Sequence, residues 1–324
     1  MTEQTINFFS NKLVKVNSVK RMVQYGIWPN CPNSCDFCLI KEKDFYDKTK
    51  QIYWIRAIKE NIKHINWSSF PYGISLLGGE IYYIKDRDVQ LEYLALIDTI
   101  IEYVLTDENK SARYSTVTNG LYEPSFLYEV IDKIISKTDL SRIDLNFSYD
   151  LKYRFKNEAA KKRVLKNIIA ARDKYNYAVG VQMILTQNLI NLWKAKQFDI
   201  NEFLAKEIPG CNFAFLYPHK IQTGIVLNDF FFKRSDFIQF LSYLKNANYE
   251  VYSNFINSAK NSAIFKYTGL QSHKRNDAKT LAEQPILSDD KDIIADCGHS
   301  ILYRCYADSN KCMLCDIENI DGDL

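Results

Sequence analysis

Short apolar runs alternate along the chain with longer stretches in which apolar residues recur at helical spacing. Together with runs in which apolar and polar residues are mixed or alternate, the apolar runs predict six strands, at residues 22–28, 73–77, 112–117, 142–148, 179–185 and 212–216. The periodic stretches predict helices after the first five strands, at residues 52–65, 89–104, 124–135, 157–175 and 190–206. Strands and helices in regular alternation favour a parallel sheet with right-handed crossovers, so the fold class that we expect is α/β.

The length of this series indicates how the chain is organised. Six strand–helix units fit an open partial barrel, (β/α)6, rather than the eight units of a complete TIM barrel. From about Thr223 the alternation stops, and a helix at residues 235–246, a polar loop-like stretch at 271–283 and a cysteine-rich end follow. We therefore expect an N-terminal segment at residues 1–21, the partial barrel at 22–220 and a C-terminal extension at 221–324.

Composition and charge restrict the function classes only mildly. Of the 324 residues, 47% are hydrophobic and 25% are charged, which is ordinary for a soluble globular protein. The net charge of +3 favours neither a membrane nor nucleic acid as a partner, and we expect neither. No apolar run is long enough to span a membrane, and residues 1–20 lack the pattern of a secretory signal. We expect a cytoplasmic protein.

Three cysteines lie close together near the N-terminus, at Cys31, Cys35 and Cys38. Thiolates with this C-x3-C-x2-C spacing can ligate three irons of a [4Fe–4S] cluster and leave the fourth iron open for a small molecule. A zinc knuckle or buried thiols are the alternatives, but zinc loops more often use paired C-x2-C units. The next cysteine is Cys211, which we expect to be a buried apolar residue at the start of a strand, with a redox or hydrogen-donor role as the alternative. The spacing therefore favours an iron–sulfur cluster and an oxygen-sensitive protein.

Polar motifs follow the next strands at the positions where the chain leaves them. Gly78-Gly79-Glu80 comes directly after the second predicted strand, and Thr118-Asn119-Gly120 directly after the third. Along the fourth strand, alternation places polar residues on one face, namely Asp144, Asn146 and Ser148. In parallel barrels the functional groups collect at the carboxyl ends of the strands. A simple turn explains each motif equally well, with a solvated Glu80 in the first and a positive φ at Gly120 in the second.

With Phe37 immediately before its third cysteine, the cysteine loop resembles that of the radical SAM superfamily. The resemblance covers about residues 22–218 and implies a partial barrel. It implies that Cys31, Cys35 and Cys38 hold a [4Fe–4S] cluster, whose open iron chelates the amino and carboxylate groups of S-adenosylmethionine. Reductive cleavage of S-adenosylmethionine would then yield a 5′-deoxyadenosyl radical that takes a hydrogen atom from the substrate.

The other motifs resemble segments of the same superfamily. Gly78, Gly79 and Glu80 are similar to its GGE motif, which implies that they hold the amino group of S-adenosylmethionine. Thr118 and Asn119 are similar to its TNG segment, Ser148 to a serine that contacts the ribose or carboxylate, and Arg154 to an arginine that neutralises the carboxylate. The chain departs from the superfamily pattern at Ile81, where a proline often stands, and in the shorter stretch before Arg154. A solvated arginine at a helix start is the alternative for Arg154.

A second group of cysteines lies near the C-terminus, at Cys297, Cys305, Cys312 and Cys315. Four thiolates complete either a second [4Fe–4S] cluster or a tetrahedral zinc site. The group is similar to the twitch or SPASM extensions of radical SAM enzymes, although the full SPASM pattern is missing. The resemblance implies an auxiliary cluster, and a structural zinc with His299 as a spare ligand is the alternative.

These patterns lead to one expected function and two alternatives. We expect a radical SAM enzyme that acts on a peptide or a small metabolite, carries an auxiliary cluster and takes electrons from an external donor such as flavodoxin or ferredoxin. The first alternative is a radical SAM enzyme that modifies a nucleobase or nucleotide and holds a structural zinc. The second is a non-catalytic metal-binding interaction protein, which the cysteine triad and Gly78-Gly79-Glu80 disfavour. The basic residues of the helix at 157–175 could contact phosphates but more often form a solvated face.

Overall fold

The computed structural model of the chain describes residues 5–8, 12–15, 22–27, 31–33, 35, 47–70, 72–176, 179–216 and 232–256. These residues divide into two compact units. The first unit holds the strands and helices up to Ser148, apart from Cys35, and then residues 157–180. The second unit holds Cys35, the loop Tyr149–Lys156 and the chain from Val181 onwards.

Four parallel strands form the sheet of the first unit, β3 (Met22–Gly26), β4 (Gly73–Leu77), β5 (Arg113–Thr118) and β6 (Ile143–Tyr149). Each strand pairs with the next one along the chain, with Val23 opposite Ile74 and Tyr114 opposite Ile143. Val23, Ile74 and Tyr114 are completely buried, as β-branched and aromatic residues are in covered parallel strands. Because the strands run in one direction, the motifs that follow them lie at the same edge of the sheet.

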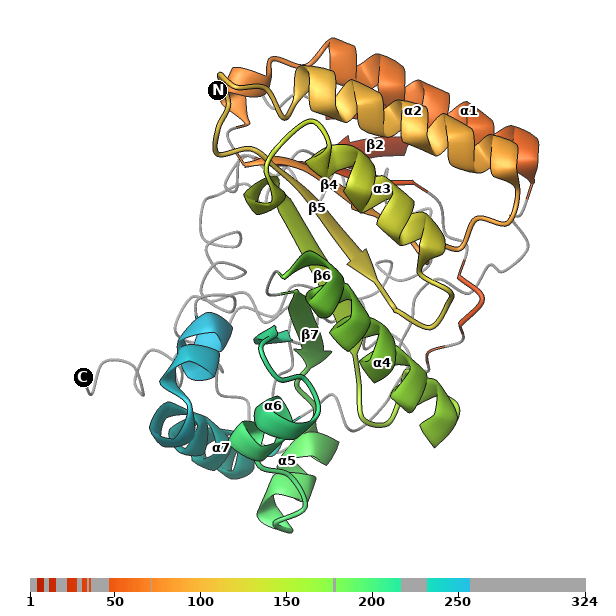
Figure 1. Cartoon of the computed structure of the whole chain (residues 1–324). Coiled ribbons are helices and arrows are strands. Elements are labelled where there is room, and N and C mark those ends of the chain that lie inside the picture. Colours follow the sequence, from red (N-terminus) through yellow and green to blue (C-terminus); the bar gives the residue numbers. More distant parts are fainter. Residues whose placement is uncertain are drawn as a thin grey trace. The chain divides into compact units, whose positions relative to one another are not determined.

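The helices of the first unit follow its strands, and they are α1 (Lys48–Lys63), α2 (Arg87–Tyr103), α3 (Ser125–Ile135) and α4 (Glu158–Tyr175). α1 lies beside α2, and α2 lies beside α3 (Figure 1). Side chains cap three of these helices at their starts, namely Asp47 at α1, Asp86 at α2 and Asn157 at α4. The caps accept hydrogen bonds from N–H groups that have no partner within the helix, and so they determine where each helix begins.

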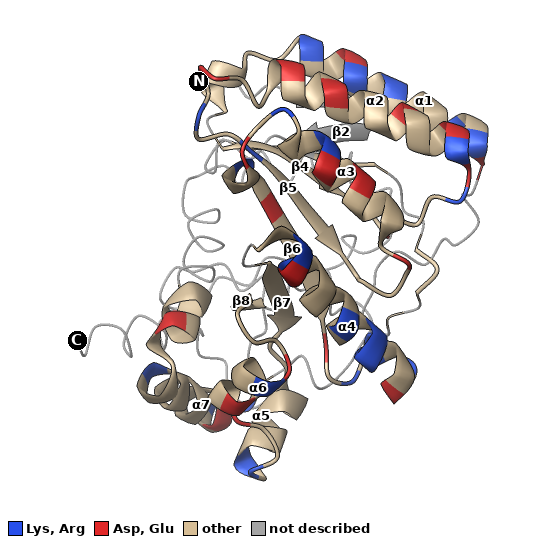
Figure 2. Ribbon diagram, viewed as in Figure 1, with Lys and Arg blue, Asp and Glu red and all other residues tan. Residues whose placement is uncertain are grey.

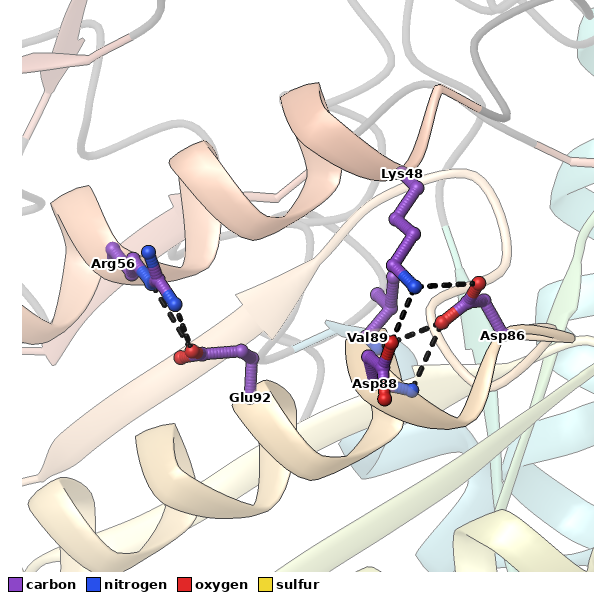
Figure 3. A network of polar contacts seen from close by, with 6 residues as sticks. All are labelled: Lys48, Arg56, Asp86, Asp88, Val89 and Glu92. Carbon is purple, nitrogen blue, oxygen red and sulfur yellow. Dashed lines mark hydrogen bonds and ion pairs between the residues drawn. The ribbon is translucent and has the colours of Figure 1, made fainter.

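Charged residues join α1 to α2 at the surface (Figure 3). Lys48 forms ion pairs with Asp86, at 3.2 Å, and with Asp88, while Arg56 Nε donates to Glu92 Oε1 at 3.0 Å. The hydrogen bond from Arg56 lowers the pKa of the Glu92 carboxyl. Exposed pairs of this kind contribute little stability, so apolar contacts between the two helices contribute most of the packing energy.

α4 carries an excess of basic residues, as α1 does. Figure 2 shows residues of both signs on α4, as on α1 and α2. Lys162, Arg163 and Lys166 are exposed, while Val164 and Ile168 are completely buried. The basic residues therefore face solvent, and phosphate binding stays a prediction.

The second unit is built around aromatic side chains. It contains β7 (Gly180–Ile184) from Val181 on, α5 (Gln187–Lys194), α6 (Ile200–Lys206), β8 (Asn212–Leu216), α7 (Arg234–Ala247) and a helical stretch at residues 249–256. The ring centroids of Phe213 and Phe215 lie 4.8 Å apart, and those of Phe215 and Phe240 lie 6.0 Å apart, both in edge-to-face geometry. Asp236 of α7 pairs with Lys194 of α5 at 2.6 Å, which joins the two helices.

The six predicted strands are confirmed, each within two residues at either end. The α/β class is also confirmed, with a mostly parallel sheet, whereas the barrel stays a prediction. The single helical stretch predicted at 190–206 is wrong, because Lys196 adopts a φ of 57° and Asp199 caps the start of α6. Two antiparallel strands precede β3 without having been predicted, β1 (Thr5–Phe8) and β2 (Lys12–Lys15). None of the described helices is long and apolar enough to cross a membrane.

Replacing Gly73 by alanine should destabilise the protein. Gly73 has a φ of +85°, and an added Cβ would lie 2.4 Å from the carbonyl oxygen of Arg113. Backbone strain of this kind costs about 1–3 kcal/mol, so the midpoint of urea unfolding should fall. Gly26→Ala is the control, because an added Cβ there meets nothing within 4 Å. Equal midpoints for the two variants would contradict this account.

Candidate metal centre and cofactor site

Glu80 is the centre of a group of polar contacts at the carboxyl ends of β4 and β5. It comes shortly after β4, and only 2% of its surface is exposed. Thr118 Oγ1 donates to Glu80 Oε1 at 2.9 Å, and Asn119 N donates to Oε2 at 2.7 Å. Tyr82 N also donates to Oε1, at 3.3 Å. The structure thus joins two predicted motifs, and the alternative of a solvated Glu80 is wrong.

The turn after β5 is held by its own polar groups. Asn119 Oδ1 accepts from Leu121 N at 2.9 Å, and Thr118 Oγ1 accepts from Gly120 N at 3.1 Å. Gly120 has a φ of +66°, and an added Cβ would lie 2.9 Å from a ring carbon of Phe147. The backbone therefore requires glycine at position 120, as expected for a simple turn. The two residues before it, Thr118 and Asn119, make the contacts with Glu80.

Of the three cysteines in the N-terminal motif, the structure describes Cys31 and Cys35, and Cys31 belongs to the first unit. The residue is half-buried, and its Sγ accepts a hydrogen bond from Asn119 Nδ2 at 3.6 Å. An N–H donor at sulfur stabilises the thiolate, which is the form that binds metal. This contact brings the cysteine motif together with the residues that follow β4 and β5, as expected at the carboxyl ends of parallel strands.

Cys35 lies in the second unit, beside Arg154. Arg154 Nη1 lies 3.9 Å from Cys35 Sγ, and the thiol donates to Arg154 O at 4.0 Å. Cys35 also packs against a buried apolar pair, Tyr153 and Ile184. If the thiol loses its proton, only the guanidinium contact stays favourable, because a carbonyl oxygen cannot donate. The contact of Arg154 with the carboxylate of S-adenosylmethionine stays a prediction.

A turn around Asp150 determines where Arg154 lies. Lys152 N donates to Asp150 Oδ1 at 2.7 Å, and Tyr153 N donates to the same oxygen. Asp150 is buried, with 4% of its surface exposed. A carboxylate that binds backbone N–H groups two and three residues later orders a loop that has no regular structure. We did not predict this role, although an aspartate at the end of a strand is a turn signal.

Buried hydroxyl groups fix the backbone next to Glu80. Tyr82 OH donates to Thr116 Oγ1 at 2.7 Å and lies 2.9 Å from Tyr114 OH, which lies 3.1 Å from Tyr93 OH. Because each phenol has a single proton, the donors run in one direction, from Tyr93 through Tyr114 and Tyr82 to Thr116. Burial raises the pKa of Tyr82 and that of Tyr93 well above the usual range, so these phenols keep their protons. The sequence shows these residues only as aromatic core positions.

The polar face of β6 is present as predicted and is hydrogen-bonded within the first unit. Ser115 Oγ donates to Asp144 Oδ2 at 3.0 Å, and Asn146 Nδ2 donates to Asp144 Oδ1 at 2.9 Å. A Cβ added to Gly180 would lie 2.0 Å from Asn146 Oδ1, so the chain enters β7 directly beside this side chain. Ser148 is partly exposed near the end of the strand, and its contact with a cofactor stays a prediction.

Several predicted residues are exposed or lie outside the described part of the chain. Gly78 is exposed, and Gly79 is partly exposed. The predicted site residues outside the described ranges are Phe37, Cys38, Cys297, Cys305, Cys312 and Cys315, together with His299. Within those ranges, no three His, Cys, Asp or Glu side chains converge as a metal site, so both cysteine sites stay predictions. The prediction that Cys211 is buried is wrong, because it is partly exposed just before β8.

The chain has a distant structural likeness to a solved protein. No family model matches the chain, and no curated protein matches it. A solved structure of a histidine-tagged protein, described as "anSMEcpe with bound AdoMet", is similar to it, with 15% sequence identity and a TM-score of 0.40. The likeness covers 72% of this chain and 62% of that chain, so this chain spans less than two thirds of the solved protein. At this level of similarity, function has to be argued from the chain's own residues.

Replacing Thr118 by valine should destabilise the metal-free protein. Valine keeps the β-branched shape but removes the hydroxyl that donates to the buried Glu80 carboxylate. Loss of such a partner costs about 1–3 kcal/mol of the free energy of unfolding, which urea unfolding measures. Thr118→Ser keeps the hydroxyl and is the control. Serine also loses a buried methyl group, so a valine variant as stable as the unmodified protein is the result that would show that this hydrogen bond does not hold Glu80.

Proposed function

We propose that this protein is a radical SAM enzyme in which Cys31, Cys35 and Cys38 hold a [4Fe–4S] cluster with one open iron. The observation that carries the proposal is the contact of Cys31 with Asn119, whose backbone binds Glu80. Hydrogen bonds thus connect the first cysteine with the motifs after β4 and β5, which spacing alone only suggests. If the cysteines formed a zinc knuckle and the two later motifs were simple turns, no hydrogen bond between Cys31 and Asn119 would be needed.

The polar groups around the two described cysteines fit an iron–sulfur cluster. Asn119 donates an amide N–H to Cys31 Sγ, and Arg154 places a guanidinium N–H at Cys35 Sγ. Donors and positive charge at cysteine sulfur stabilise thiolate ligands, and they are among the groups that tune a bound cluster. Buried structural thiols, the other alternative, would need neither donor.

Glu80, together with Gly78 and Gly79, would orient the amino group of S-adenosylmethionine, while Ser148 and Arg154 would orient its other polar groups. Because Thr118 and Asn119 already hold the Glu80 carboxylate, its side chain would lose little conformational freedom on binding. When bound, the cluster supplies the electron that cleaves S-adenosylmethionine to a 5′-deoxyadenosyl radical. The chain's own residues bind and orient the cofactor and exclude water and oxygen.

The finer parts of the proposal rest on the sequence. The substrate is a peptide or a small metabolite, and the electrons come from an external donor such as flavodoxin or ferredoxin. A second [4Fe–4S] cluster is held by Cys297, Cys305, Cys312 and Cys315, whose number and spacing support four-thiolate ligation. The grouping of Cys31, Cys35 and Cys38 and of the four C-terminal cysteines as candidate metal ligands supports an oxygen-sensitive enzyme, for which we propose a cytoplasmic location.

Replacing Cys35 by alanine should abolish reductive cleavage of S-adenosylmethionine. The variant loses one of three ligands of the first cluster and should lose its iron, while the C-terminal site keeps its metal. The measurements are iron and sulfide content, EPR of the reduced protein and 5′-deoxyadenosine formation. Cys211→Ala, outside both cysteine groups, is the control and should keep full activity. Continued 5′-deoxyadenosine formation by the Cys35 variant would overturn the assignment of the first site.

Anaerobically reconstituted protein should bind about eight irons, on the basis of two [4Fe–4S] clusters. Metal analysis of the Cys35→Ala variant should then show about four irons, held by the C-terminal cysteines. A plateau at about four irons with one zinc in the unmodified protein would favour the structural zinc and the nucleobase alternative. Zinc at both sites and no iron would favour the non-catalytic alternative.

A further inference from the structure

We propose that the side-chain amide of Asn119 sets the reduction potential of the cluster by donating a hydrogen bond to the sulfur of Cys31. The inference rests on the proposed function, because it takes Cys31 as a cluster ligand. The observation behind it is a buried amide nitrogen 3.6 Å from that sulfur. Asn119 then acts on the cluster itself, in addition to any contact with S-adenosylmethionine.

The turn after β5 determines which end of the amide faces the sulfur. Asn119 Oδ1 accepts a hydrogen bond from Leu121 N at 2.9 Å. In a flipped amide, Nδ2 would meet the N–H of Leu121, so that two donors would face each other. The oxygen is therefore engaged by the backbone, and the nitrogen is the atom directed at Cys31.

Glu80 holds the backbone of the same residue. Asn119 N donates to Glu80 Oε2 at 2.7 Å, and Thr118 Oγ1 donates to Oε1 at 2.9 Å. Both Glu80 and Asn119 are buried, with 2% and 4% of their surfaces exposed. Hydrogen bonds to a buried carboxylate are stronger than those between neutral groups, so this contact holds Asn119 firmly. Glu80 is thus a positioning residue that acts on the sulfur through Asn119.

α4 holds the other side of the turn. Asn167 Nδ2 donates to the carbonyl oxygen of Gly120 at 2.8 Å and to that of Tyr122 at 3.1 Å. The two neighbours of Asn119 in the chain are therefore both held in place, Thr118 by Glu80 and Gly120 by Asn167. Because the amide of Asn167 binds the backbone of the turn, a change there tests distortion of the turn separately from loss of the hydrogen bond to sulfur.

A hydrogen bond to thiolate sulfur withdraws electron density from the cluster. It favours the reduced cluster, which carries one more negative charge, and so raises the reduction potential. The low dielectric around a buried donor strengthens the effect. Leucine in place of Asn119 has no donor, and aspartate has no donor and adds a negative charge. Both substitutions should therefore shift the potential to more negative values, aspartate by the larger amount.

The test is a potentiometric titration of the reconstituted full-length protein, followed by EPR. The signal to follow is the one that the Cys35→Ala variant lacks, which separates the first cluster from the C-terminal one. Asn119→Leu and Asn119→Asp should show more negative midpoint potentials than the unmodified protein. Asn167→Leu is the matched control, which removes the contacts of α4 with the turn but keeps the donor at sulfur, so its midpoint potential should shift less than those of the Asn119 variants.

A second measurement detects the hydrogen bond directly. Pulsed EPR of the reduced protein in D2O should show an exchangeable deuteron coupled to the first cluster. Arg154 contributes an exchangeable deuteron at Cys35 Sγ as well, so Asn119→Leu should lose one of the deuteron couplings, whereas Asn167→Leu should keep them all. Unmodified protein without such a deuteron would overturn the proposal even if the Asn119 variants bind too little iron to titrate.

Two titration results would also overturn the proposal. One is an unchanged midpoint potential in both Asn119 variants, and the other is an equal shift in Asn167→Leu, which would attribute the effect to a distorted turn. If the proposed function itself is wrong, the iron analysis shows this before any midpoint potential is measured. Protein that binds no [4Fe–4S] cluster at Cys31, Cys35 and Cys38 would fail at the iron analysis, before any titration.

Discussion

The burial of the Glu80 carboxylate is the constraint on which the candidate site depends. A charge with 2% of its surface exposed needs donors close by, and Thr118 and Asn119 at the end of β5 supply them. The ends of β4 and β5 are therefore joined through one side chain. The same turn directs Asn119 at Cys31. A change at any of these residues alters the environment of the cysteine, because the hydrogen bonds form one continuous chain.

Each of the two described cysteines, Cys31 in the first unit and Cys35 in the second, has a side-chain N–H group directed at its sulfur. In the first unit, the Glu80 carboxylate binds the backbone of the turn whose amide reaches Cys31. In the second, the Asp150 carboxylate binds the backbone of the loop whose guanidinium reaches Cys35. In both cases a buried carboxylate orders irregular backbone, and the ordered backbone places an N–H donor at sulfur. Loops at strand ends thereby gain the rigidity that a metal centre requires.

The sequence predicts the strands well because runs of five to seven residues, apolar or alternating and bounded by turn residues, are too short for most helices. It is less informative where a boundary depends on a single polar contact. The break between α5 and α6 rests on the left-handed backbone of Lys196, which its residue type does not indicate, and on the cap from Asp199. Asp199 with Glu202 three residues later is a helix-start signal that the prediction of one stretch did not use. The aromatic residues around Tyr82 are predicted as core, and only their packing shows that their hydroxyl groups form an ordered chain.

The sequence by itself determined the α/β class, the order of the strands and the positions of the motifs at their carboxyl ends, because periodicity and spacing are local properties of the chain. It also determined which residue types could hold metal and cofactor. Only the tertiary structure decided that Glu80 is buried rather than solvated, that Asn119 turns its nitrogen toward Cys31, and that Arg154 lies at Cys35. These outcomes depend on hydrogen bonds between residues far apart in the chain, and such bonds form only when the strands and loops that carry them are packed together.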